Sequence, residues 1–292
     1  MSEAKGNGVI QQRWKAIYEA AGEGRAEDLK KALKHRAARV DFQQRFDKGE
    51  LTATPLTAAA HGGHVECVKI LLDANATINL AASSGSTPLS LACQQGHEHV
   101  GEMLLVAGAD INQPKTNGCT PLYMASERGT ALCVQMLLGA GASVDQAATT
   151  HTPESRAGVG VVEGATPLYA AASEGKVDTC KLLLSAGAVV GSETVHGATP
   201  LIGACMGNPC SRSRSGANRA KVVALLLAAD ADWTQPTCKE KTALEWARED
   251  AAAGLPHGAA VAEAMVAPRA SDPHLGATVS ADDSDLVSFA GP

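Results

Sequence analysis

The chain has 292 residues, 45% of them apolar, so it can fold around a sizeable core. Its formal net charge is −6. Its pI of about 5.8 argues against a protein that binds nucleic acid over its whole surface. The N-terminal residues lack the apolar stretch of a secretory signal, and no run of 18 apolar residues could span a membrane. Eight cysteines are too dilute for a disulfide scaffold. We therefore expect a reducing compartment, the cytoplasm or the nucleus, and no membrane insertion.

A Thr-Pro-Leu triplet recurs along the chain. It begins at Thr54, Thr87, Thr120, Thr166 and Thr199, and a relaxed copy, Thr-Ala-Leu, begins at Thr242. Three of the five spacings are 33 residues, and the other two exceed 33 by 13 and 10 residues. Most triplets keep a glycine two residues before the threonine, an alanine five residues after it and a glycine nine residues after it. A period of this length predicts a stack of similar units.

Each unit has the pattern of a turn, a short helix, a second turn and a longer helix. Threonine followed by proline is typical of a helix start, because the hydroxyl caps free N–H groups and proline fits the first turn. The later glycine, such as Gly63, predicts the end of that helix after roughly two turns. Val68, Leu71 and Leu72 then lie at helical spacing. Neither helix is long enough to be stable alone, so the units must stack.

This pattern resembles the ankyrin repeat, with its period of 33 residues and its T-P-L-H-x-A signature. The resemblance implies an all-α fold, an ankyrin-repeat α-solenoid of about seven helix-turn-helix units with β-turn fingers. We expect a flexible tail at residues 1–12, the array at 13–265 and a disordered tail at 266–292. The array begins with a degenerate unit at 13–48, and later units start at 54, 87, 120, 166, 199 and 242. Insertions lie near 147–162 and 208–217.

One position departs from the family pattern. The residue after Thr-Pro-Leu is usually a histidine that ties neighbouring units by hydrogen bonds. Here the position holds Thr57, Ser90, Tyr123, Tyr169 and Ile202. If each lost hydrogen bond is worth about 1 kcal/mol, the stack should be softer than a consensus array.

Candidate metal and catalytic sites are sparse. His61 and His64, and likewise His97 and His99, have a spacing that can ligate zinc, but no cysteine or carboxylate joins them at metal spacing. The chain has no G-x-G-x-x-G, P-loop, H-E-x-x-H or G-x-S-x-G motif. We therefore expect no bound metal, no cofactor and no catalytic activity.

Most of the cysteines follow the repeat, which predicts that they are small buried core residues. Cys119 and Cys238 instead lie in predicted fingers, where we expect them to be exposed. A different class of function therefore stays open: a redox-active or enzymatic protein that uses the long finger or these two thiols.

The family binds protein partners through its fingers and the exposed face of its first helices. The resemblance therefore implies a protein–protein interaction module or scaffold with a concave groove, monomeric, with an unidentified protein partner and no nucleic acid. An adaptor that recruits a substrate to other machinery, such as a ubiquitin ligase, is the alternative. Carried over position by position, the groove residues are His61, Ser83, Ser84, Ser86, Gln94, Gln95, Thr116, Asn117, Glu127, Arg128, Ser173, Glu174, Val195, His196 and Met206.

Three residues are candidate modification sites. Asn79 and Asn112 resemble positions at which ankyrin asparagines are hydroxylated by an oxygen-sensing dioxygenase. Ser215 follows Arg212 and Arg214 in the second insertion, a pattern that suits a basophilic kinase.

Overall fold

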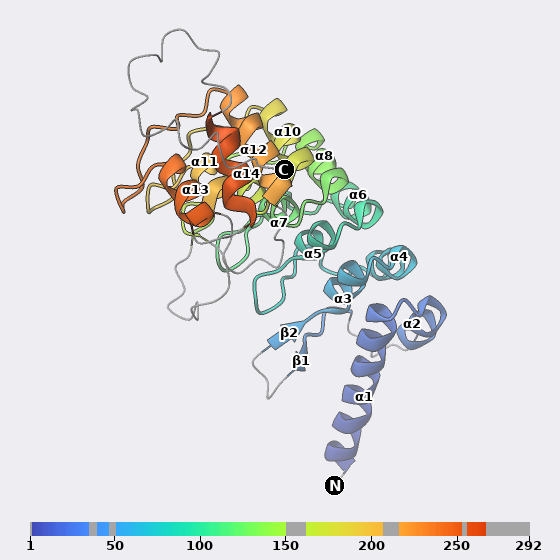
Figure 1. Cartoon of the computed structure of the whole chain (residues 1–292). Coiled ribbons are helices and arrows are strands. Elements are labelled where there is room, and N and C mark those ends of the chain that lie inside the picture. The colour runs from blue at the N-terminus through green and yellow to red at the C-terminus, as the bar shows by residue number, and fades with distance from the viewer. Residues whose placement is uncertain are drawn as a thin grey trace, which may run out of the picture.

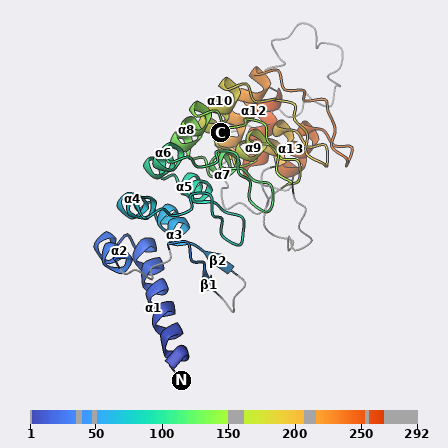
Figure 2. The same ribbon diagram turned by 180° about the vertical axis from the view of Figure 1, so that it is seen from behind.

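The structure is a computed structural model that describes residues 2–34, 40–46, 51–149, 162–206, 216–252 and 256–266. Fourteen helices lie in these ranges, and they pair and stack in chain order from α1 at one end to α13 and α14 at the other (Figures 1 and 2). The predicted all-α solenoid of about seven helix-turn-helix units is therefore confirmed. None of the described helices is long and apolar enough to cross a membrane.

The helices form two layers, because each first helix packs on the first helices of its neighbours and each second helix on the neighbouring second helices. The first layer consists of α1 (Ser2–Gly22), α3 (Pro55–Gly62), α5 (Pro88–Gln95), α7 (Pro121–Arg128), α9 (Pro167–Ser173), α11 (Pro200–Met206) and α13 (Ala243–Ala252). The second layer consists of α2 (Ala26–Leu33), α4 (Val65–Asp73), α6 (Glu98–Val106), α8 (Ala131–Gly139), α10 (Val177–Ser185), α12 (Gly216–Ala228) and α14 (Pro256–Val266).

The threonine of each Thr-Pro-Leu triplet starts a first-layer helix, as predicted. In α3, α5, α7 and α9 its hydroxyl accepts a hydrogen bond from the backbone N–H three residues later, at 3.1–3.3 Å. Proline follows at the first helical position. Gly63, Gly96 and Gly129 end α3, α5 and α7 in the left-handed conformation, which glycine adopts without the steric cost of a side chain.

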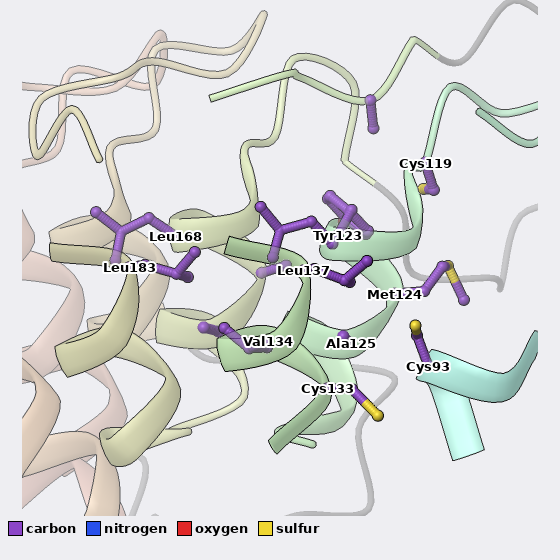
Figure 3. Close-up of a cluster of buried hydrophobic side chains, with 14 of the residues drawn as sticks. Cys93, Cys119, Tyr123, Met124, Ala125, Cys133, Val134, Leu137, Leu168 and Leu183 are labelled. Carbon is purple, nitrogen blue, oxygen red and sulfur yellow. The ribbon is translucent and has the colours of Figure 1, made fainter. Parts of the chain in front are cut away.

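The core lies between the two layers and follows the repeat. The first leucine of each Leu-Leu pair is fully buried, and the second is half-buried. On the first-layer helices the fifth residue after each threonine is an alanine of 0% exposure, which lets the helices approach closely. Figure 3 shows this arrangement, with Leu137 and Leu183 of the second layer beside Leu168 and Ala125 of the first.

Neighbouring units are tied by a residue at the start of the second-layer helices. His64 Nε2 donates to the Gly22 carbonyl at 2.9 Å, and His97 Nε2 donates to the His61 carbonyl at 3.0 Å. In the next unit Thr130 takes the same role, because its hydroxyl donates to the Cys93 carbonyl at 2.8 Å. These bonds give His64 and His97 a structural role in the stack.

A second set of ties crosses the units near the fingers. In each pair a side-chain oxygen of one unit accepts a hydrogen bond from a backbone N–H of the next unit. The pairs are Asp41 with Thr77 (2.8 Å), Asn79 with Asp110 (2.9 Å), Asn112 with Ser143 (2.9 Å) and Asp145 with Val189 (3.1 Å). Thr57 and Ser90, at the family's histidine position, instead bond within their own units. The inter-unit contacts thus come from positions other than that histidine.

The turns before the first-layer helices form fingers, each closed by a backbone hydrogen bond. The first is a hairpin in which β1 (Gln44–Phe46) pairs antiparallel with β2 (Leu51–Ala53), and these are the strands of the described residues. The next fingers span 82–86, 115–119, 194–198 and 237–241. Backbone bonds join neighbouring fingers, as from Ser83 N to Thr52 O (3.0 Å) and from Cys238 N to His196 O (3.0 Å).

The N-terminus corrects one expectation. Residues 1–12 were predicted to be a flexible tail, but α1 begins at Ser2 and extends away from the stack (Figure 1). The second half of α1 packs against α2 and α3, and its residues Ile17, Ala20 and Ala21 are buried. Extending a helix that is already formed costs far less than nucleating one, and no proline interrupts the segment.

The last helix ends at Val266, one residue beyond the predicted array. Most of the two predicted insertions and the predicted C-terminal tail lie outside the described residues.

Candidate functional site

The predicted groove residues lie on the first-layer helices and in the fingers that precede them. We call this the finger–helix surface: the exposed and half-buried side chains of α3, α5, α7, α9, α11 and α13 and of the fingers that precede these helices. His61, Gln95 and Arg128 are exposed in the last turn of successive first-layer helices. Further predicted residues of this surface are exposed or half-buried: Ser83, Ser84, Gln94, Thr116, Asn117, Glu127, Glu174, Val195, His196 and Met206.

Contacts between units hold several of these side chains in place. Gln95 Nε2 lies 3.3 Å from His61 Nε2, so the ends of α3 and α5 are linked. The Thr116 hydroxyl donates to the Ser84 carbonyl at 3.0 Å and joins two fingers. Because the supporting units are packed and capped, this surface is arranged before any partner arrives.

Two predicted groove residues are instead buried. Ser86 is 4% exposed, and its hydroxyl lies 2.8 Å from the Ser84 hydroxyl at the closed end of a finger. Ser173 is 9% exposed and donates to the Ala170 carbonyl at 3.1 Å in the last turn of α9. Both hydroxyls satisfy local polar groups, so little of either side chain is open to a partner, although Ser173 lines the pocket described next.

A pocket of about 260 Å³ opens on the finger–helix surface. It lies where α7, α9, α11 and α13 meet the fingers at 194–198 and 237–241. Five predicted groove residues line it: Glu127, Ser173, Glu174, His196 and Met206. The structure therefore brings together residues from three repeat units that are up to 79 positions apart in the chain, between Glu127 and Met206.

Three aromatic rings that line this pocket were missed in the sequence. Tyr123 and Tyr169 occupy the family's histidine position, where they were interpreted only as a loss of inter-unit bonds. Trp246 lies in the last unit, which begins with the relaxed triplet at Thr242. The recurrence of a ring at one repeat position in two successive units was the available signal, because equivalent positions of stacked helices face the same side.

The pocket contains a partly buried carboxylate. Burial raises the pKa of Glu127, and the negative charge of Glu174 raises it further. Arg128, Lys115 and Lys176 act in the opposite direction. Within the described residues no hydrogen bond or ion pair is formed by the Glu127 carboxylate. Glu127 is therefore less hydrated than a surface carboxylate and lacks the partner that usually accompanies burial.

The cysteines correct another expectation. Cys119 was predicted to be exposed, but it is 0% exposed, and burial raises the pKa of its thiol to about 12. It follows the finger glycine Gly118 in the finger at 115–119 that precedes α7. Cys238 is exposed, as expected. Cys67, Cys93, Cys133, Cys180 and Cys205 are buried, as their repeat positions predict.

This difference predicts selective alkylation. In a Cys210→Ser background at pH 8, iodoacetamide should modify Cys238 rapidly and leave Cys119, Cys180 and Cys205 unmodified. A thiol with a pKa of about 12 is almost wholly protonated at that pH, and the thiolate is the nucleophile. Peptide mass spectrometry would follow each site. Modification of native Cys119 at the rate of Cys238 would mean that the finger does not cover it.

The candidate modification sites have different surroundings. Asn79 and Asn112 are half-buried, and each side-chain oxygen bonds the next unit, so both asparagines have a structural role. Their hydroxylation stays a prediction, and a mass increase of one oxygen on either peptide is its signature. Ser215 lies outside the described residues.

The chain matches known proteins over most of its length. The family described as ankyrin repeats (3 copies) matches residues 17–115, 78–148 and 99–193. Among solved structures, the human ASB11 ankyrin repeat domain is similar, with 27% sequence identity and a TM-score of 0.64 over 85% of this chain and 96% of that chain. No curated protein sequence matches the chain. The matched ranges span residues 17–193, more than half of the sequence, and they agree with the stacked helix pairs. The chain therefore belongs to the ankyrin repeat family.

Proposed function

We propose that the chain is a protein-interaction module or scaffold that binds a protein partner through the finger–helix surface. Ankyrin repeats are generic protein–protein interaction modules, which supports the class of function. The observation that carries the choice of surface is the pocket, because residues of two fingers and four first-layer helices converge on it. The second-layer helices pack against these first-layer helices, and the threonine N-caps stabilise the starts of the helices.

The mechanism is presentation of a rigid surface. The framework of caps, leucines and alanines is repeated, whereas the exposed residues differ from unit to unit. A partner of ordinary size would cover about 800 Å² of this chain, which three or four units can supply. Because the fingers are already bonded to one another, the chain loses little conformational entropy on binding.

A matched pair of variants tests this proposal. The first carries His61→Ala, Gln95→Ala, Arg128→Ala and Val195→Ala on the finger–helix surface, outside the pocket. The second carries four exposed substitutions on the second layer: Lys69→Ala, Glu102→Ala, Gln135→Ala and Lys181→Ala. Circular dichroism should first show that both are as helical as the parent chain.

Partners captured from a lysate of the source cells by the parent chain should be lost by the first variant and kept by the second. Calorimetry on a purified partner should show affinity at least about tenfold lower, since hot-spot truncations each cost more than about 1 kcal/mol. Loss in the second variant alone, or retention by both, would place the binding site elsewhere.

The alternatives differ in the residues they need. An adaptor would recruit its machinery through residues near the C-terminus, so deletion of 268–292 that leaves every partner bound would end that alternative. A redox role now rests on Cys238 among the described fingers, and unchanged function in Cys238→Ser would remove it. The proposed module acts as a monomer and binds neither nucleic acid nor a cofactor. We place it in the cytoplasm or the nucleus, and its buried free thiols are in keeping with a reducing compartment.

A further inference from the structure

The pocket on the finger–helix surface has a negative centre. Glu127, in the last turn of α7, is half-buried there and has no hydrogen-bond or ion-pair partner in the described part of the chain. Glu174, at the end of α9, adds a second carboxylate to the lining. The charges of Arg128, Lys115 and Lys176 act to lower the pKa of Glu127, but within the described residues none of them forms an ion pair with its carboxylate. A carboxylate that has lost water without gaining such a direct partner is costly, and an entering cation that pairs with it would remove that cost.

The walls of the pocket also favour a cation. The half-buried ring of Trp246 on α13 contributes most of the aromatic wall, because Tyr123 on α7 and Tyr169 on α9 are only 2% and 8% exposed. The face of an aromatic ring attracts positive charge. Trp246 already does so within the chain, because Lys241 Nζ lies 4.9 Å and Lys239 Nζ 5.6 Å from its ring centroid.

The size of the pocket limits the occupant. A volume of about 260 Å³ has room for a side chain, whereas a helix measures about 10 Å across with its side chains. An arginine fits this chemistry better than a lysine does, because the planar guanidinium stacks on aromatic rings and can bond a carboxylate through two N–H groups.

We propose that this pocket receives an arginine side chain from an extended segment of the protein partner. The guanidinium pairs with Glu127, the charge of Glu174 adds to the attraction, and the apolar stem lies against the ring of Trp246. This inference rests on the proposed function and adds the chemistry of the partner to it. Lys239, an exposed residue that lines the pocket, carries the same charge as the incoming group and weakens its binding.

The test uses a small probe and therefore does not depend on the identity of the partner. N-acetyl-arginine N-methylamide is titrated into the full chain while NMR follows the three tryptophan indole N–H signals, with Trp246 assigned by Trp246→Phe. We expect a saturable shift of the Trp246 signal and none of the Trp14 signal, since Trp14 lies on α1 at the other end of the stack. The citrulline derivative, which has nearly the same shape without the charge, should bind at least about tenfold more weakly.

Two variants should change the affinity in opposite directions. Glu127→Gln should weaken arginine binding at least about tenfold, and Lys239→Ala should strengthen it about two- to fivefold. Glu102→Gln, which removes an exposed charge from α6, should leave it unchanged. Circular dichroism would show that each variant is folded.

Any of three results would overturn the inference: no saturable shift at Trp246, equal binding of the arginine and citrulline derivatives, or unchanged binding in Glu127→Gln. Stronger binding of an N-acetyl-glutamate derivative would assign the pocket to an acidic residue and would also overturn it. The His61, Gln95, Arg128 and Val195 variant contains no pocket residue. If the probe fails and that variant still loses its partners, the proposed function stands without the arginine.

Discussion

Replacing Leu137 with alanine is expected to lower the free energy of unfolding by about 2–5 kcal/mol. Leu137 is 0% exposed in α8 and lies between the two layers, near Leu168 and Leu183 (Figure 3). The substitution removes apolar contacts and leaves a cavity. The surrounding helices cannot close this cavity, because alanines such as Ala125 already hold them in close contact.

Leu132→Ala is the matched control, since Leu132 lies on the same helix and is 60% exposed. Its free energy of unfolding should stay within about 0.5 kcal/mol of the parent chain. Urea unfolding followed by circular dichroism gives both values. Similar losses in the two variants would mean that α8 does not turn Leu137 toward the first layer.

Gly63→Ala is expected to cost about 2–4 kcal/mol, for two reasons that add together. Gly63 ends α3 with φ 72°, a conformation that a residue with a Cβ atom adopts only with strain. In addition, a Cβ atom at this position would lie 2.4 Å from Nδ1 of His97, the ring that ties the next unit to the His61 carbonyl. The substitution therefore strains the helix end and pushes two units apart.

Gly108→Ala separates these two causes. Gly108 has φ 93° and open space around the position of a Cβ atom, so only the backbone strain applies, about 1 kcal/mol. Combining Gly63→Ala with His97→Ala should cost less than the sum of the two single changes, because the smaller side chain relieves the clash. Additive losses, or equal losses at Gly63 and Gly108, would show that the clash is absent.

The repeat made most of the fold predictable. A single Thr-Pro pair predicts a helix start only weakly. Five such pairs occur at equivalent positions of the repeat, and glycines such as Gly63 and Gly96 follow at the expected helix ends, so the individual predictions support one another. The structure confirms the caps, the helix ends and the buried leucines. These features depend on local backbone chemistry, so the sequence specifies them directly.

Features that depend on contacts between units were predicted less well. Cys119 and Ser86 lie in fingers and are nevertheless buried, and their own sequence neighbours do not reveal this. The aromatic lining of the pocket was missed for the same reason, because only the stacking of four units brings Trp246 and Tyr123 to one pocket. The helix over residues 2–12 was missed because it extends from a packed segment that anchors it.

Hydrogen exchange of the chain with and without a captured partner would locate the binding surface. We expect slower exchange in α7, α9 and α11 and in the fingers at 115–119 and 194–198, with α6, α8 and α10 unchanged. Such a footprint would place the partner on the finger–helix surface. Protection confined to the second-layer helices, or to the two ends of the stack, would show that the partner binds elsewhere.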